Sequence, residues 1–296
     1  MTHDEAAVVA ETPVPRDGPL GVPAEPVVPV VPAQPAPPAL ALRGINLVFG
    51  GVQALDNIDF EVNCHEIVAL VGENAAGKST LAKVMAGVYR PTSGVIYSEG
   101  TPVTINSPAA ATRLGIATVF QDLALANNLD VTANMFLGHE LNRASVLYRE
   151  EMENAARAVL DQIGARIPSV RYPVANLSAG QRQSVAIARA LLAQPRIVVL
   201  DEPTSSLSIT QTGEILDLIV RMRGLGHGIV LISHNLADVQ AVADRVVVMR
   251  HGRIVGTAPM SFVTYEDIVA AITGATRALP APPTTRASRV VGTGTS

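Results

Sequence analysis

The sequence predicts an α/β fold in which a mostly parallel β-sheet is covered by helices on both faces. Short apolar runs, typical of strands buried on both sides, occur at residues 67–71, 116–120, 196–200, 229–233 and 245–249. Segments with apolar residues at helical spacing lie between several of these runs, and strands that alternate with helices form parallel sheets. The patterns at residues 45–62 and between about residues 122 and 193, described below, predict an N-terminal antiparallel β subdomain and an inserted helical subdomain.

The two ends of the sequence are predicted to be tails. Residues 12–38 contain ten prolines, and each proline removes a backbone donor and restricts its predecessor, which excludes helix and sheet. We therefore expect residues 1–40 to be a disordered or polyproline-like tail, and a partner-binding role for its proline motifs stays open. Residues 277–296 are again rich in Pro, Thr and Gly. They form a second predicted tail, which leaves residues 41–276 as the folded domain.

The antiparallel β subdomain is predicted at the start of this domain. Residues 45–49 and 54–62 read as two strands joined by a turn at Gly50 and Gly51. Apolar and acidic residues alternate from 58 to 62, so this sheet should have one face in solvent. A further short strand is expected at residues 95–97, after a turn.

The helical subdomain is predicted between about residues 122 and 193. A short helix near residues 132–137 should end at Gly138, and a longer one should end at Gly164. The longer helix has one apolar face, formed by Met152, Ala155, Ala156, Val159, Leu160 and Ile163.

Composition limits the classes of function. The formal charge of −4 comes without a basic cluster, so nothing favours a nucleic-acid partner. The single cysteine, Cys64, indicates a reducing compartment and is expected to be a small buried side chain. Since no apolar run reaches the roughly 18 residues of a membrane-spanning helix and no secretory signal is recognisable, we expect a cytosolic protein that docks on other subunits.

Residues 72–80 carry the clearest chemical motif. They join the apolar run 67–71 to a predicted helix that begins near Lys78, and they match the pattern G-x-x-x-x-G-K-[ST] of phosphate-binding loops. In such loops backbone N–H groups and a helix N-terminus bind an anion, the lysine reaches the outer phosphates, and the hydroxyl of Ser79 ligates Mg²⁺. The predicted phosphate-binding residues are Gly72, Glu73, Asn74, Ala75, Ala76, Gly77, Lys78, Ser79 and Thr80. The helix should bury a stripe of Leu81, Val84, Met85 and Val88.

An acidic pair, Asp201 and Glu202, follows another apolar run. The carboxyl ends of strands are where an open α/β sheet places its ligand crevice. An acid at this position can hold Mg²⁺ opposite the phosphate loop, and Glu202 beside it can accept a proton from an attacking water. Together with the loop, these residues predict a nucleoside triphosphatase (NTPase) core of the phosphate-loop kind.

Residues 177–183, Leu-Ser-Ala-Gly-Gln-Arg-Gln, open a predicted helix in which Ser178 is an N-cap. This stretch resembles the LSGGQ signature of ATP-binding cassette (ABC) proteins, and it precedes Asp201 as in that family. Phe49 is similar to the aromatic residue that stacks on adenine, Gln121 to the Q-loop glutamine and His234 to the switch histidine. Residues 205–208 occupy the position of the D-loop, and the match runs from about residue 42 to 256.

The resemblance implies an ATPase that works as a head-to-tail pair. Each ATP would lie between the phosphate loop of one cassette and the signature residues Ser178, Ala179, Gly180 and Gln181 of the other. The implied catalytic residues are Glu202, His234, Lys78 and Gln121. The implied ligands of Mg²⁺ are Ser79, Gln121 and Asp201.

Residues 120–125, 128–131 and 136–138 are similar to the ATP-binding subunits of simple-sugar importers. This resemblance implies a position on the cytoplasmic face of the cell membrane, where the helical subdomain grips a permease that is served by an extracytoplasmic sugar-binding protein. The partner cassette is a second copy, which we favour, or a related subunit. Import of nucleosides or other small polar solutes stays open, because such systems would use closely similar cassettes.

Three residues depart from the pattern of the family. Ala75 stands where glycine is usual, and alanine fits there only if its φ stays negative. Ala179 replaces the first signature glycine, and Ser208 stands where an aspartate is common. We expect normal ATP binding with modest hydrolysis.

Two other functions remain open at this point. A soluble ABC ATPase of repair or translation usually has coiled-coil insertions or two cassettes with a basic linker, and this sequence shows neither. A nucleotide sensor without catalysis would not need Lys78, Asp201, Glu202 and His234 together.

Overall fold

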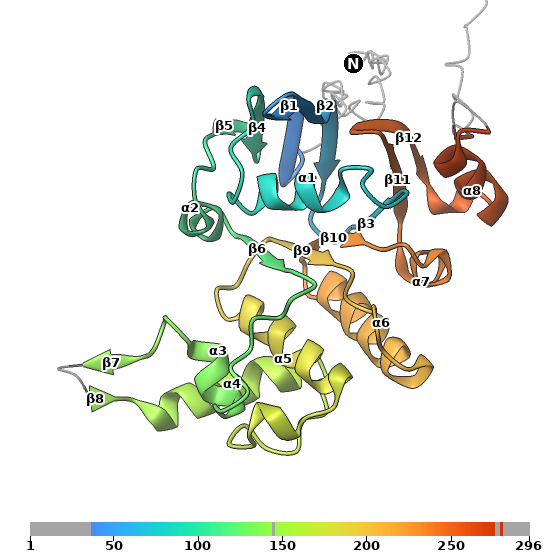
Figure 1. Cartoon of the computed structure of the whole chain (residues 1–296). Helices are drawn as coiled ribbons and strands as arrows, with labels where there is room; N and C mark the ends of the chain where they lie inside the picture. The colour runs from blue at the N-terminus through green and yellow to red at the C-terminus, as the bar shows by residue number, and fades with distance from the viewer. Residues whose placement is uncertain (1–36, 144–145, 276–278, 281–296) are drawn as a thin grey trace, which may run out of the picture. The chain divides into compact units, whose positions relative to one another are not determined.

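The computed structural model describes residues 37–143, 146–275 and 279–280. The predicted N-terminal tail lies almost entirely outside these residues. Their centre is a six-stranded sheet in the order β12-β11-β3-β10-β9-β6, parallel except for the antiparallel pair β11–β12 (Figure 1). Its strands are β3 (Ile67–Val71), β6 (Ile116–Val119), β9 (Ile197–Asp201), β10 (Gly228–Ile232), β11 (Arg245–Arg250) and β12 (Arg253–Pro259). All five apolar runs therefore form strands of this sheet, as predicted.

A second sheet, antiparallel in the order β2-β1-β4-β5, covers one side of this centre. Its strands are β1 (Leu40–Phe49), β2 (Val52–Val62), β4 (Ser93–Ser98) and β5 (Thr101–Val103). Leu40 pairs with Val62 and Phe49 with Val52, so β1 begins earlier than predicted. The predicted antiparallel β subdomain is confirmed, and β5 is an addition that the sequence did not indicate.

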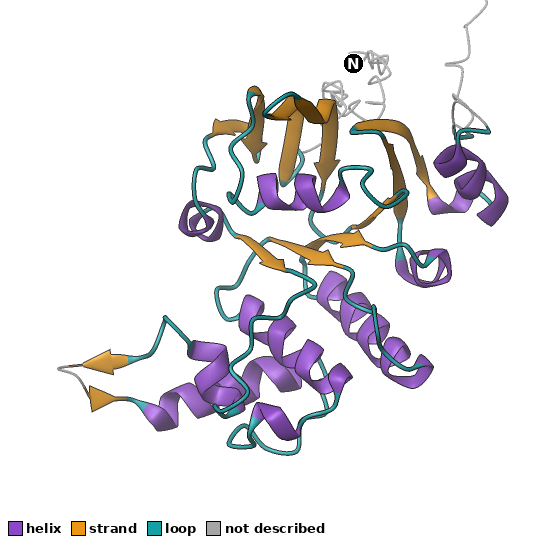
Figure 2. Ribbon diagram, in the orientation of Figure 1, coloured by secondary structure: helices purple, strands orange, loops and turns teal. Residues whose placement is uncertain are grey.

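Helices cover the central sheet on both faces (Figure 2). Side chains alternate across each strand. Leu70 and Val230 pack with helix α1 and the antiparallel sheet, whereas Leu200 and Leu231 pack on the opposite face, with α5 and α6. The helices that flank the two sheets are α1 (Lys78–Met85), α2 (Pro108–Arg113), α6 (Ile209–Gly224), α7 (Leu236–Val242) and α8 (Tyr265–Thr273), with a short 3-10 helix η2 (Met260–Phe262). This is the layered α/β arrangement predicted from the sequence.

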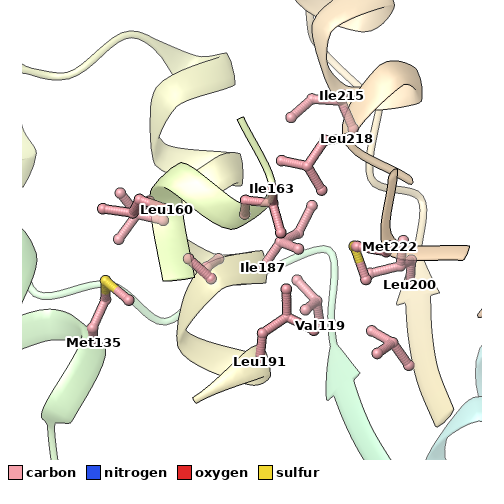
Figure 3. Close-up of a cluster of buried hydrophobic side chains, with 14 of the residues drawn as sticks. Val119, Met135, Leu160, Ile163, Ile187, Leu191, Leu200, Ile215, Leu218 and Met222 are labelled. Carbon is pink, nitrogen blue, oxygen red and sulfur yellow. The ribbon is translucent and has the colours of Figure 1, made fainter. Parts of the chain in front are cut away.

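The segment between β6 and β9 is helical, as predicted. It contains α3 (Val131–Phe136), α4 (Arg149–Gln162), η1 (Val174–Asn176) and α5 (Ala179–Leu191), with a short hairpin of β7 (Asn142–Arg143) and β8 (Val146–Leu147). Gly138 and Gly164 follow α3 and α4 with positive φ, which suits glycine at helix ends. Figure 3 shows how this subdomain joins the sheet, since Leu160, Ile187 and Leu191 belong to one buried cluster with Leu200 and Met222.

Three details of the prediction are wrong. Cys64 is exposed, because it lies in a turn after β2 and not in the core. Val88 lies beyond the end of α1 and is 46% exposed, so it does not continue the buried stripe. Leu279 is buried against β12 and α8, so the fold reaches into the stretch predicted as the C-terminal tail.

Among the described helices, none combines the length and the apolar character required to cross a bilayer.

Candidate functional site

The phosphate loop lies between β3 and α1, as the sequence predicted. Gly77 is the N-cap of α1 with φ 103°, and glycine has no side chain to occupy the first N–H groups of the helix. Those groups are therefore available to an anion, which the helix dipole also favours. Gly72 has φ 152°, and a Cβ there would collide with the carbonyl oxygen of Met249. The loop consequently needs glycine at both of its ends.

Ala75 does not have the negative φ that the sequence analysis required for an alanine at this position. Its φ is +65°, in the left-handed region, where a Cβ is penalised. The turn around it is closed by a hydrogen bond from the Ala76 N–H to the Glu73 carbonyl oxygen, 3.1 Å long. Alanine therefore occupies a conformation that suits glycine, and the loop carries a local strain of about 1 kcal/mol.

Lys78 is buried at the base of the loop. Its Nζ donates to the carbonyl oxygens of Gly72 and Glu73, at 2.8 and 2.9 Å. Burial lowers the pKa of the ammonium group, whereas the nearby charges of Glu202 and Asp201 raise it. The loop carbonyls thus hold a cation beside the N-terminus of α1, next to the space where phosphate oxygens would lie.

Asp201 ends β9 and faces the first turn of α1. The hydroxyl of Ser79 donates to Asp201 Oδ1 across 3.2 Å. Burial raises the pKa of the Asp201 carboxyl, while the bond from Ser79 and the charge of Lys78 act in the opposite direction. A carboxylate and a hydroxyl oxygen side by side are ligands that Mg²⁺ accepts together with phosphate oxygens and water, so this donor set fits the ion.

Glu202 and His234 form a pair at the ends of β9 and β10. Glu202 Oε2 lies 2.6 Å from His234 Nδ1. Glu202 has φ +53°, and its N–H donates to the carbonyl oxygen of Ile232. This backbone turn aims a carboxylate and an imidazole, two groups able to accept or hold a proton, at the same place.

All of these groups except Asp201 border one cleft of about 1120 Å³. Residues 72–80, Gln121, Glu202 and His234 line it, so the structure brings these predicted residues together. Sequence reasoning missed His251 and Tyr265, which line the same cleft. A turn could have been read from His251-Gly252, but Tyr265 belongs to α8, a helix that was not predicted.

Three predicted groups do not line the cleft: Phe49, the signature residues, and Asp201, which reaches the loop only through Ser79. The ring of Phe49 is 43% exposed and packs edge-on against Tyr89, with centroids 4.9 Å apart. Ser178 is exposed at the start of α5, where its hydroxyl accepts from the Gln181 N–H and the Gln181 side chain accepts from the Ser178 N–H. This capping box holds Ser178 at the surface, outside the cleft that holds the phosphate loop, whereas Gly180 of the signature is buried.

A second, smaller groove of about 590 Å³ lies where the helical subdomain meets the sheet. Its walls are mostly apolar, with Phe120 and Leu137 among them. Arg189 of α5 crosses to the segment after Gln121 and donates to the carbonyl oxygens of Leu123 and Ala124, at 2.7 and 3.0 Å. The groove is therefore tied, through this arginine, to the loop that carries Gln121 into the nucleotide cleft.

A phosphate loop that faces an acidic pair at the strand ends defines a nucleotide-binding domain of the phosphate-loop class. The family model for the ABC transporter matches residues 55–205. The chain is 38% identical over 234 residues to the xylose/arabinose import ATP-binding protein XylG of Sulfolobus acidocaldarius, which covers 79% of this chain and 93% of that protein. It is 44% identical over 217 residues to the ribose import ATP-binding protein RbsA 1 of Rubrobacter xylanophilus, which covers 73% of this chain and 43% of that protein.

The fold comparison agrees. The crystal structure of the ADP conformation of MJ1267, an ATP-binding cassette of an ABC transporter, matches with a TM-score of 0.70 at 26% identity, over 80% of this chain and 95% of that chain. The chain belongs to the ABC transporter family and is an ATP-binding cassette of the ABC ATPase kind. It spans nearly the whole length of the Sulfolobus relative but less than half of the ribose relatives.

Proposed function

We propose that the chain hydrolyses ATP to power an importer of a simple sugar. The observation that carries this proposal is the arrangement of one cleft, in which the phosphate loop with Lys78 faces Asp201 and the Glu202–His234 pair. Binding a nucleotide would not by itself require all of these groups. It supplies in addition an acceptor for the proton of an attacking water.

The roles of the residues follow from their positions. The N–H groups of residues 72–80 and the ammonium of Lys78 would bind the phosphates and offset the negative charge that develops during hydrolysis. Mg²⁺ would be held by Ser79, Asp201 and Gln121, and the ion would supply neutralisation of the phosphate oxygens. Glu202 would take the proton of the water, and His234 would keep the carboxylate aimed at it.

A second copy of the chain completes this site in our proposal. Ser178 is exposed at the start of α5 and lies outside the cleft of its own chain. In a head-to-tail pair Ser178 and the start of α5 would meet the outer phosphate of the ATP that the partner copy holds. The adenine of that ATP would stack on Phe49 of the copy that holds it. Hydrolysis would then open the pair.

The transport role rests on the relatives, which are import proteins for xylose, arabinose and ribose. The groove beside Arg189 is the site that we propose for a membrane permease, which would place the chain at the cytoplasmic face of the membrane. Thr118 lines this groove, and its hydroxyl is buried without a hydrogen-bond partner in the described structure. A sugar-binding protein would deliver the cargo on the other side.

Two measurements test the proposal. The purified chain should hydrolyse Mg-ATP at a rate per molecule that rises with protein concentration, and Lys78→Ala should abolish the activity. Vesicles that contain the chain and its permease should take up labelled xylose, arabinose or ribose only with ATP. A rate per molecule independent of concentration would contradict the shared site. Uptake of nucleosides with none of these sugars would contradict the sugar assignment.

A further inference from the structure

One buried carboxylate near the cleft has no part in the chemistry described above. Asp238, in the first turn of α7, is 6% exposed and does not line the cleft. Its two oxygens accept from two neutral donors. The hydroxyl of Thr204 donates to Oδ2 at 2.6 Å, and Nδ2 of Asn235 donates to Oδ1 at 2.9 Å.

The two donors come from the two loops that carry the proposed hydrolytic pair. Thr204 lies two residues after Glu202, in a turn where the Glu202 carbonyl oxygen accepts from the N–H and the hydroxyl of Ser205. Asn235 directly follows His234. Asp238 therefore bridges the loop after β9 to the loop after β10.

This bridge spans a place where the backbone is strained. Glu202 has φ +53°, a conformation that costs about 1–3 kcal/mol for a residue with a side chain and persists only if its surroundings enforce it. The direct contact between Glu202 and His234 is a single hydrogen bond to an imidazole that is largely exposed. One exposed bond is a weak constraint on these two side chains, although the bond from the Glu202 N–H to the Ile232 carbonyl oxygen also ties the Glu202 backbone to the end of β10.

We propose that Asp238 is a positioning residue that clamps these two loops through Thr204 and Asn235, and so holds Glu202 against His234. This inference rests on the proposed function, because it assigns the clamp to the same hydrolytic site. A carboxylate suits the task because its two oxygens accept two hydrogen bonds at once. An asparagine has only one oxygen and would place an NH₂ group against one of the two donors.

The first test removes the hydroxyl of Thr204, which does not contact the cleft. Thr204→Val should lower kcat for ATP hydrolysis about tenfold, because a loosened support lets the reacting groups drift from their alignment. KM and the affinity for Mg-ATP should stay within about twofold, since the phosphate loop is untouched. Thr204→Ser retains the hydroxyl and should restore kcat. Thr257→Val, at an exposed position of β12, is the matched control.

A double-mutant cycle separates positioning from general loss of structure. In a His234→Ala background there is no pair left to align, so Thr204→Val should lower kcat little further. The proposal is overturned if the two losses multiply, or if Thr204→Val alone keeps the wild-type kcat. Asp238→Asn, which keeps the shape of the side chain and removes its charge, is the second variant if Thr204→Val folds poorly. It should also lower kcat without changing KM.

A spectroscopic readout does not depend on activity. At fixed pH, the ¹⁵N signals of the His234 ring in the nucleotide-free chain should move in Thr204→Val toward those of Glu202→Gln, and Thr204→Ser should leave them in place. If the wild-type chain hydrolyses no ATP but these signals move, the proposed function fails and the clamp stands. If hydrolysis is present and the signals stay unchanged in Thr204→Val, the clamp fails and the function stands.

Discussion

Two helix N-termini of this chain carry the motifs that point to a phosphate, and they differ in their surroundings. The start of α1 lies in a cleft with Lys78, Asp201 and the Glu202–His234 pair beside it. At the start of α5 Ser178 is exposed, and it pairs with Gln181 of the same helix. The chain therefore contains a nearly complete site at one helix and an incomplete one at the other, which is the arrangement expected if each completes the site of a second copy.

The local sequence accounts for the difference. Gly77 leaves the first turn of α1 without a side-chain cap, and a Cβ there would lie 3.0 Å from the Ala54 carbonyl oxygen. Ser178 caps α5 by a reciprocal pair of bonds, so that helix is stable without a ligand. The start of α1 is thus uncapped inside a cleft, whereas the start of α5 is capped by its own side chains.

The largest expected effect comes from breaking the hydrolytic pair. Glu202→Gln should reduce hydrolysis by at least about a hundredfold, because the amide cannot accept the proton of the water. Mg-ATP should still bind, and it should now hold two copies together for longer. Light scattering with and without Mg-ATP checks this outcome. Full activity in Glu202→Gln would remove Glu202 from the role of base.

An intermediate effect is expected at Asp201, where one substitution should raise stability and impair function. Burial holds the pKa of this carboxyl above its ordinary value of 3.8, so the folded chain binds a proton more readily than the unfolded chain. Its contribution to stability therefore falls as pH rises from about 3.8 through the folded pKa, and the loss persists at pH 7.

Asp201→Asn removes this penalty. The nucleotide-free variant should melt higher than wild type at pH 7, by a few degrees per kcal/mol, and the difference should shrink near pH 4. The same change should abolish the Mg²⁺ dependence of ATP binding. Thermal melts at both pH values and calorimetry with Mg-ATP measure the two effects, and a lower melting temperature at pH 7 would contradict this account of Asp201.

The smallest effect is expected at Ala75. Ala75→Gly should relieve the left-handed strain and raise the melting temperature by about 2–4 °C for a gain near 1 kcal/mol. Ala179→Gly is the matched control, because Ala179 is the first residue of α5 and has no such strain. The control should be neutral or slightly destabilising. Equal shifts in both variants would mean that φ at Ala75 carries no cost.

Local pattern predicted most of the site, because its chemistry lies at the ends of short apolar strands. β3, β9 and β10 are continuous apolar runs, so the positions of Lys78, Asp201 and His234 follow from the chain itself. α8 was missed although its signals are local, since Thr264 and Asp267 form a capping box at its start and Gly274 caps its end. The positive φ of Ala75 was also beyond prediction, since it depends on how the loop closes and not on residue type.

The exposed position of Cys64 and the burial of Leu279 were predicted wrongly for a related reason. Both residues were judged by their type or by the composition around them, whereas burial is set by the neighbours that the fold supplies.

The central claim is that the two helix starts act on one nucleotide across two copies. It can be tested by mixing Lys78→Ala, which damages the phosphate loop, with Ser178→Arg, which blocks the signature surface. Each variant should be inactive by itself. Mixed pairs contain one undamaged composite site, so an equal mixture should recover about a quarter of the wild-type ATPase rate. A mixture as inactive as its components, or a fully active Ser178→Arg variant, would contradict the account.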